Sequence, residues 1–302
     1  MAPSLFRLLP VLAGVTAVAG QSCPLQFDGR IPRNFTVADF DTQNGIYNPD
    51  FVKGRDLAFS DIIELETDAT LFDTNSVPFT VQIDDSSIFA PSADNVQTGF
   101  RRVELLPASN SGTDDSTLGI KTLHFSVAKD VTRPLNLSHE YQLVFLESAD
   151  YSNSQFDIKT GTILGRDTPD PDTIQVYGNI NAGAALLYST PFTEGVIHNF
   201  ALRLDYETGT TQIFYSQDQA QLQSVTDILA NDLSGQGQYH IGLLKKPTGS
   251  DGDITREGFQ SSGINEAVLY GGIFLEDSAD GCLSLGPSCP SRARRSRFRR
   301  DI

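Results

Sequence analysis

The chain has 302 residues with three cysteines and no tryptophan, a length that a single all-β domain can fill. Acidic residues outnumber basic ones by 38 to 22, and six of the arginines lie between residues 292 and 300. When those six, Arg7 and Asp301 are set aside, 15 basic residues remain against 37 acidic ones. A body with this charge repels polyanions, which argues against nucleic acid as a partner and favours a neutral ligand over an acidic polysaccharide.

Residues 1–20 have the composition of a secretory signal peptide. Arg7 is followed by a run of Leu, Val and Ala that ends in the small residues 17–19. No later stretch has the roughly 18 apolar residues of a membrane span. We therefore expect a secreted, extracellular protein without a membrane anchor. Two sequons, at Asn34 and Asn136, predict N-glycosylation in that compartment.

The three cysteines lie only at the two ends of the chain, at positions 23, 282 and 289. In an oxidising compartment one pair is expected to form a disulfide. We favour Cys23 with Cys282, because Cys289 lies farther out in the tail. No Cys-x-x-Cys spacing indicates a metal site, and we expect no cofactor.

Apolar and polar residues alternate along most of the chain, and this period of two indicates β-strands. In chain order the pattern occupies 101–107 (RRVELLP), 121–127 (KTLHFSV), 139–147 (HEYQLVFLE), 173–177 (TIQVY), 198–206 (HNFALRLDY) and 211–216 (TQIFYS). The turn residues 207–209 predict a hairpin between the last two strands. Only 224–231 indicates a helix, and 51–63 is ambiguous.

Short strands separated by turns are typical of an antiparallel sandwich, and no repeat or composition shift marks a second domain. The sequence therefore predicts an all-β fold, a concanavalin-like β-jelly roll of two antiparallel sheets with a concave polar groove. We assign residues 21–285 to this domain. Residues 286–302 form a basic tail that we expect to be disordered or processed.

Two of the predicted strands each carry a glutamate, Glu104 and Glu140, among alternating apolar residues. Successive side chains of a strand point to opposite faces, so Arg102 shares a face with Glu104, and Gln142 shares a face with Glu140. The apolar face of the second strand is then formed by Tyr141, Leu143 and Phe145.

The same parity places Gln238 and His240 on the polar face. His240 has three possible roles there: a base, a group that tunes a carboxylate, or a ligand of substrate hydroxyls. A hydrogen-bonded structural role is the alternative. Because the chain lacks tryptophan, stacking on a sugar ring would fall to other aromatic residues, and the candidates are Phe100, Tyr151, Tyr177 and Tyr239. A single β-bulge would invert any of these assignments.

Two carboxyl groups across one groove match the needs of glycosidic bond hydrolysis, which uses one acid and one base or nucleophile. Arg102 favours the ionised form of the neighbouring Glu104. We therefore expect Glu104 to be the ionised partner and Glu140 to be the acid. The alternative is a structural Arg102–Glu104 ion pair and a Glu140 that is merely exposed on its strand.

Four segments closely resemble fungal glycoside hydrolase family 131, namely 98–107 (TGFRRVELLP), 134–151 (PLNLSHEYQLVFLESADY), 234–248 (SGQGQYHIGLLKKPT) and 257–280 (EGFQSSGINEAVLYGGIFLEDSAD). The opening segment 23–30 (CPLQFDGR) is also similar. The resemblance implies a β-jelly roll with broad β-glucanase activity on β-1,3-, β-1,6- and β-1,4-glucans. It also implies catalytic carboxylates at Glu104 and Glu140. The expected partner is thus a β-glucan, and we expect a monomer that inverts the anomeric centre.

Two other functions stay open. A jelly-roll polysaccharide lyase would neutralise a polyuronate and abstract its α-proton, and its working groups would be Arg102, Gln238, Tyr239 and His240. The negative charge of the chain disfavours that substrate. A non-catalytic, lectin-like glucan-binding module would use the same face without chemistry. Unsaturated uronyl products would identify the lyase, and glutamate substitutions that change only binding would identify the module.

Overall fold

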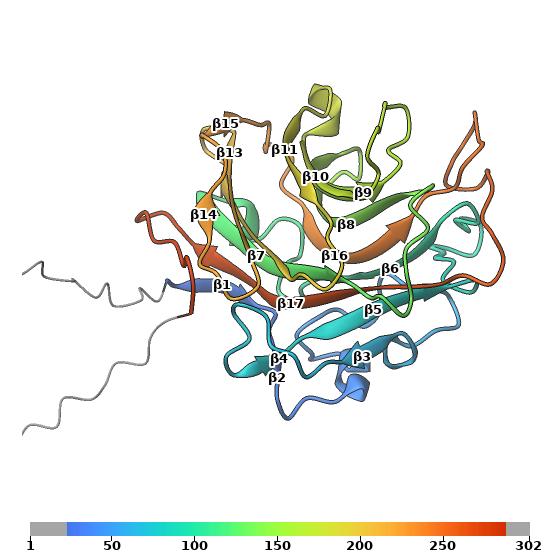
Figure 1. The fold of residues 1–302 in the computed structure, drawn as a ribbon, viewed down its shortest axis with the longest axis horizontal. Helices are drawn as coiled ribbons and strands as arrows, with labels where there is room; N and C mark the ends of the chain where they lie inside the picture. Colours follow the sequence, from blue (N-terminus) through green and yellow to red (C-terminus); the bar gives the residue numbers. More distant parts are fainter. Residues whose placement is uncertain (1–22, 288–302) are drawn as a thin grey trace, which may run out of the picture.

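The computed structural model describes residues 23–287, so the predicted signal peptide and most of the basic tail, with Cys289, lie outside the described residues. Strands dominate the described part, and they form two packed sheets (Figure 1). The six-stranded sheet consists of β6 (Arg101–Leu105), β8 (Glu140–Glu147), β9 (Ser154–Gly161), β10 (Thr173–Gly178), β11 (Leu186–Pro191) and β16 (Gln238–Lys245).

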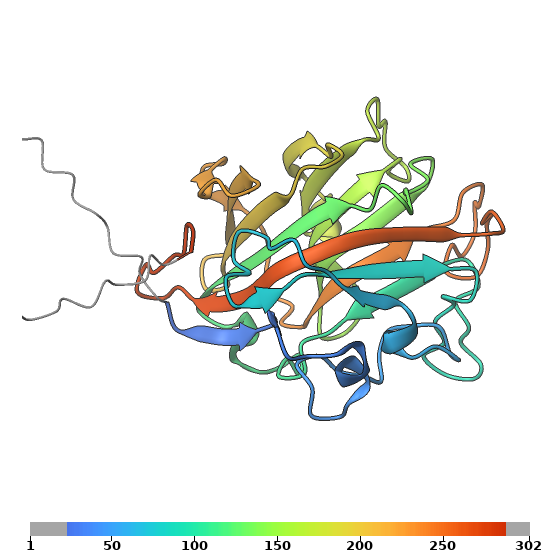
Figure 2. The same cartoon turned by 60° about the horizontal axis from the view of Figure 1, so that its bottom comes forward.

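The nine-stranded sheet consists of β1 (Leu25–Asp28), β3 (Ile63–Leu65), β5 (Phe79–Asp84), β7 (Ile120–Lys129), β12 (His198–Asp205), β13 (Thr210–Gln217), β14 (Gln223–Ser224), β15 (Leu229–Ala230) and β17 (Asn265–Asp277). The remaining elements are the strand pair β2 (Ile31–Pro32) and β4 (Ser76–Val77), and the short 3₁₀ helices η1 (Val37–Asp41), η2 (Phe59–Asp61), η3 (Asp115–Thr117) and η4 (Ile180–Ala182). All strand pairs are antiparallel, with the order β11-β10-β9-β8-β16-β6 in the smaller sheet. In the larger sheet, Figure 2 shows the long strand β17 flanked by β5 and β7.

The predicted all-β jelly-roll fold is confirmed. Strands form at each of the six segments where alternation predicted them, and residues 207–209 join β12 to β13 as a hairpin, with Asp205 opposite Thr210. The ambiguous segment 51–63 contains η2 and the first residue of β3. The helix predicted at 224–231 is wrong: β14 and β15 pair with β13 there. An open strand edge offers these residues backbone hydrogen bonds that a weak local helix preference does not outweigh.

The core lies between the two sheets because each strand directs alternate apolar residues inward. Val103 on β6, Ile158 on β9 and Val81 on β5 have no more than 1% of their surface exposed and belong to one continuous cluster. The side chains on the other face of each strand therefore point away from the core. On the six-stranded sheet, that outward face carries the polar residues considered below.

One bulge in β8 changes the predicted parity. Gln142 pairs with Lys159 and Val144 pairs with Ile158, so β8 has one residue more than β9 at this point. Leu143 and Val144 both enter the core. Phe145, predicted on the apolar face, instead lies on the outward face, where its ring stacks on His240 with 4.4 Å between ring centroids. Glu147, two residues farther on, is carried to the outward face with it.

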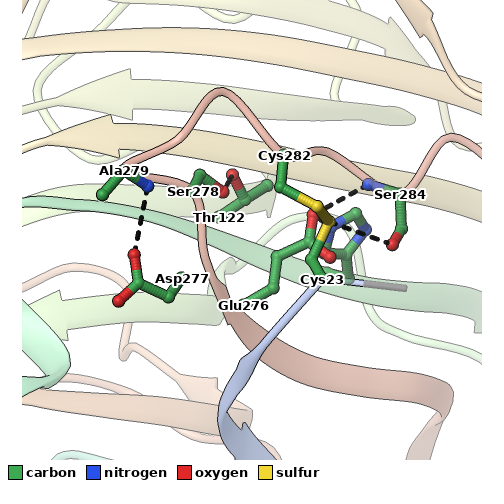
Figure 3. The surroundings of a disulfide bond; sticks show 9 residues. Cys23, Thr122, Glu276, Asp277, Ser278, Ala279, Cys282 and Ser284 are labelled. Atoms are coloured by element: carbon green, nitrogen blue, oxygen red, sulfur yellow. Dashed lines mark hydrogen bonds and ion pairs between the residues drawn. A yellow bond between two sulfur atoms is a disulfide. The ribbon is translucent and has the colours of Figure 1, made fainter. Parts of the chain in front are cut away.

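The predicted disulfide between Cys23 and Cys282 is confirmed, and it joins residues 259 positions apart (Figure 3). The neighbouring Ser284 donates its backbone N–H to Glu276 over 2.9 Å. Both ends of the described chain are thus fixed against β17. Asn34 and Asn136 are exposed, and their glycosylation stays a prediction. Within residues 23–287 no helix is long and apolar enough to cross a membrane.

Candidate active site

The outward face of the six-stranded sheet, here called the polar face, carries an unusual number of buried polar side chains. From β6 to β10 they are Arg102, Glu104, His240, Glu140, Gln142, Asp157, Lys159 and Gln175, each with less than 10% of its surface exposed. Buried charges require partners. The partners divide these side chains into two clusters, one around Glu104 and one around Glu140.

Glu104 is held by a two-point ion pair and a histidine. Arg102 donates Nε to Oε1 and Nη2 to Oε2, both over 2.6 Å. His240 Nδ1 lies 2.7 Å from Oε2. Burial alone would raise the pKa of Glu104, but the Arg102 charge and the His240 hydrogen bond outweigh it and lower the pKa to about 2. Glu104 is therefore ionised, as the sequence predicted.

His240 joins Glu104 to a second carboxylate. Its Nε2 lies 3.4 Å from Oε2 of Glu147, whose side chain is 30% exposed. Burial lowers the pKa of His240, but its hydrogen bond to Glu104 and the charges of Glu104 and Glu147 raise it above 6.5 overall. Glu104, His240 and Glu147, here called the array, thus lie in contact in that order, and Glu147 is the accessible end. The contact of His240 with Glu147 is one of charge, because Nε2 has no hydrogen-bond partner among the described residues.

This array is expected to give a pH window of maximum stability. The lowered pKa of Glu104 contributes stability that is present above its ordinary value of 4.5 and is lost as the pH falls towards about 2. The raised pKa of His240 contributes stability that is present below 6.5 and is lost as the pH rises through the folded-state value. Thermal unfolding temperatures measured against pH should therefore peak between those limits. In His240→Gln the alkaline decline should be weaker, whereas parallel declines in variant and wild type would contradict the assignment.

Glu140 belongs to the second cluster. It accepts hydrogen bonds from Lys159 Nζ over 2.8 Å, from Lys246 Nζ over 2.6 Å and from the backbone N–H of Leu164 over 2.7 Å. Burial raises its pKa, but the charges of Lys246 and Lys159 lower it by more. Glu140 is therefore held ionised in this structure, whereas the acid role predicted for it requires a proton at the working pH.

Glu104 and Glu140 both project from the polar face, but they share no hydrogen-bond partner among the described residues. Gln142 donates to Asp157, and Gln238 donates to the backbone oxygen of Asn110 over 2.9 Å. Tyr239 is corrected by the structure. It is 1% exposed in the core and its hydroxyl lies 2.6 Å from that of Tyr206, so it does not reach the polar face.

Glu147 is a residue that sequence reasoning missed. Strict alternation from Glu140 places Glu147 on the apolar side, and only the bulge at Leu143 reverses this. The one signal available was its charge, because a glutamate at the end of an otherwise apolar strand has to reach water or a cation.

Two hollows open on the polar face, one at Glu147 and one farther along the sheet at β10 and β11. The smaller, about 60 Å³, is lined by Glu147, Gln238 and the exposed Tyr151, among others. The larger, about 530 Å³, is lined by Gln175, Tyr177, Leu186 and the loop between β9 and β10. Among residues 23–287, no group of three or more His, Cys, Asp or Glu side chains is arranged to hold a metal ion.

Comparison with known proteins identifies the family of the chain. Residues 25–281 match the family model described as the glycoside hydrolase 131 catalytic N-terminal domain. The chain belongs to glycoside hydrolase family 131. It is a glycoside hydrolase, and the resemblance drawn from its sequence segments is confirmed. No curated protein sequence matches the chain.

Two solved structures share the fold of this family 131 enzyme. One is the catalytic domain of the family 131 protein from Coprinopsis cinerea, with a TM-score of 0.67, 21% identity, and coverage of 87% of this chain and 97% of that one. The other is the catalytic domain of a family 131 β-glucanase from Podospora anserina, with a TM-score of 0.68, 21% identity, and coverage of 87% and 98%.

Proposed function

We propose that this glycoside hydrolase is a secreted, monomeric β-glucanase that cleaves β-1,3-, β-1,6- and β-1,4-linked glucans. The observation that carries the proposal is the array of Glu104, His240 and Glu147, which supplies two carboxyl groups and a proton carrier at one point of the polar face. The description of the Podospora relative as a β-glucanase supports the substrate class. The excess of acidic residues suits a neutral polysaccharide.

In the proposed reaction Glu147 takes the acid role predicted for Glu140. Glu147 protonates the glycosidic oxygen, because its side chain is the accessible end of the array. Ionised Glu104 stabilises the positive, oxocarbenium-like transition state and holds His240 in place. Water attacks the anomeric carbon as the bond to the leaving oxygen breaks, and the proton that this water loses passes to solvent. Solvent returns a proton to the partly exposed carboxylate of Glu147, so one water is consumed and the array ends in its starting state.

We propose inversion because His240 holds the two carboxylates apart, with contacts of 2.7 Å to Glu104 and 3.4 Å to Glu147. Retention would need the two carboxyl groups only about 5–5.5 Å apart. An inverting enzyme releases the α-anomer first from a β-glucan. Proton NMR of the fresh products measures this directly, and initial release of the β-anomer would overturn the stereochemical proposal.

The lyase alternative is less well supported. It needs Tyr239 beside His240, and Tyr239 is buried in the core; it also needs a free Arg102, which is paired with Glu104. The test is product analysis on laminarin, pustulan and β-1,4-glucan, with a polyuronate as control. Reducing ends without ultraviolet-absorbing uronyl groups, released from the glucans alone, are expected. Unsaturated products from the polyuronate would overturn the proposal, and binding without any release would favour a non-catalytic module.

A further inference from the structure

A row of side chains crosses four strands of the polar face. His240 on β16 lies opposite Phe145 on β8, Phe145 lies opposite Asp157 on β9, and Asp157 lies opposite Tyr177 on β10. Neighbouring strands are about 4.8 Å apart, so the row extends about 14 Å from His240 to Tyr177. A linear chain of about three sugar units spans that length. Its four side chains are each no more than 4% exposed, so the row lies beneath the surface of the polar face and sets the distance between the array and the larger hollow.

The hollow at the end of the row has a mixed apolar and polar lining. Leu186 is 51% exposed. The Tyr177 ring lies beneath the Arg166 guanidinium, 4.8 Å from the ring centroid, and its hydroxyl donates to Gln175 over 2.6 Å. Pyranose rings present apolar C–H faces and a rim of hydroxyls, so a neutral sugar matches this combination of surfaces.

Asp157, in the middle of the row, has an unused hydrogen-bonding atom. Its side chain is 1% exposed, and Oδ1 has no hydrogen-bond partner among the described residues, while Oδ2 accepts from Gln142 and lies 3.2 Å from Lys159. Burial raises the pKa of this carboxyl. A buried polar atom without a partner is costly, and Asp157 lies beneath the surface of the polar face, where its carboxyl contacts Lys159 and Gln142.

Glu140 holds the wall of the hollow in position. The loop between β9 and β10 contributes Arg166 to the lining, and the backbone N–H of Leu164 in that loop donates to Glu140. On its other side the loop is fixed by Arg166, which donates to the backbone oxygens of Gly183 and Ala184 over 3.0 and 2.7 Å. The Leu164 contact thus ties this loop to Glu140, while Lys159 and Lys246 neutralise the charge of the carboxylate.

We propose that the hollow over Tyr177 is a distal subsite that binds a glucosyl unit about three units from the cleavage point, and that Glu140 is a positioning residue for its wall. The inference rests on the proposed β-glucanase function. It implies that substrates too short to reach Tyr177 are cleaved poorly because they lose binding energy, while the chemistry at Glu147 is unaffected.

The test compares β-linked gluco-oligosaccharides of two to seven units as substrates. For the wild type, kcat/KM should rise with length until the chain reaches Tyr177. Tyr177→Ala should lower kcat/KM about tenfold on the hexasaccharide, the equivalent of about 1.4 kcal/mol, and much less on the disaccharide. Leu186→Arg, at a half-exposed edge position that does not support the core, should act in the same direction. Ile228→Arg, at an exposed apolar residue between β14 and β15, is the matched control and should have no length-dependent effect.

The positioning role of Glu140 has its own signature. Glu140→Gln should raise KM for the hexasaccharide about tenfold and change kcat less than about threefold. Equal losses on all lengths in Tyr177→Ala and Leu186→Arg, or a fall confined to kcat in Glu140→Gln, would overturn the inference. If the wild type cleaves no glucan, the β-glucanase proposal fails instead. Calorimetric titration of the wild type and Leu186→Arg with the hexasaccharide then still decides the subsite, because weaker binding in the variant supports it and equal binding overturns it.

Discussion

Replacement of Glu104 or Glu147 by glutamine is expected to lower kcat on β-glucan by about a thousandfold or more, with the fold intact. Glutamine has nearly the shape of glutamate but neither donates an acidic proton nor carries charge. At Glu147 the loss removes the proposed proton donor, a contribution of about 10²–10⁴-fold in rate. At Glu104 it removes the charge that pairs with Arg102 and His240. Initial rates of reducing-sugar release at saturating laminarin measure both effects.

Glu140→Gln is the matched control for these two variants, because it removes a buried carboxylate from the same face and the same strand as Glu147. Its kcat should stay within about threefold of the wild type. Circular dichroism and thermal unfolding of all three variants show whether each one folds. Two results together would refute the assignment of Glu147 as the acid: a folded Glu140→Gln without turnover and a folded Glu147→Gln with nearly normal kcat. The acid role would then belong to Glu140.

Loss of the Cys23–Cys282 disulfide is expected to destabilise the enzyme strongly. The bond closes a loop of 259 residues, and the entropy that such a closure removes from the unfolded chain corresponds to about 5.5 kcal/mol. For a domain of this size the unfolding temperature should fall by about 10 °C or more. The comparison is between wild type and the double variant Cys23→Ser with Cys282→Ser, measured by scanning calorimetry.

Two controls distinguish the effect of losing the crosslink on the unfolding temperature from the effect of the serine substitutions themselves. Wild type measured in a reducing agent should unfold at the temperature of the double variant, and Cys289→Ser should match the untreated wild type because it retains the Cys23–Cys282 pair. If the double variant unfolds within about 2 °C of the wild type, the termini are fixed by packing alone. In that case Ser284 and Glu276 carry the attachment through their hydrogen bond.

Local pattern was sufficient for the strands. In β7 and β12 apolar residues recur every second position, and a strand is the one regular structure that buries them all on a single face. The pairing of Cys23 with Cys282 could also be predicted, because it needed only the compartment and the order of the cysteines. The helix predicted at 224–231 is wrong because its helical pattern is short and weak. Strands form there instead, since the free edge of β13 offers them backbone hydrogen bonds.

The roles proposed for the carboxylates depend on contacts that no local pattern contains. The sequence by itself determined an all-β sandwich, its terminal disulfide, the polar face with Glu104 beside Arg102, and its likeness to family 131. The tertiary structure decided which second glutamate joins that pair. His240, 136 residues from Glu104, connects it to Glu147, and Lys246, 106 residues from Glu140, holds Glu140 ionised elsewhere on the face. Alternation is a property of one strand, whereas a bulge and the charge beside a carboxylate come from the neighbouring strands that folding brings together.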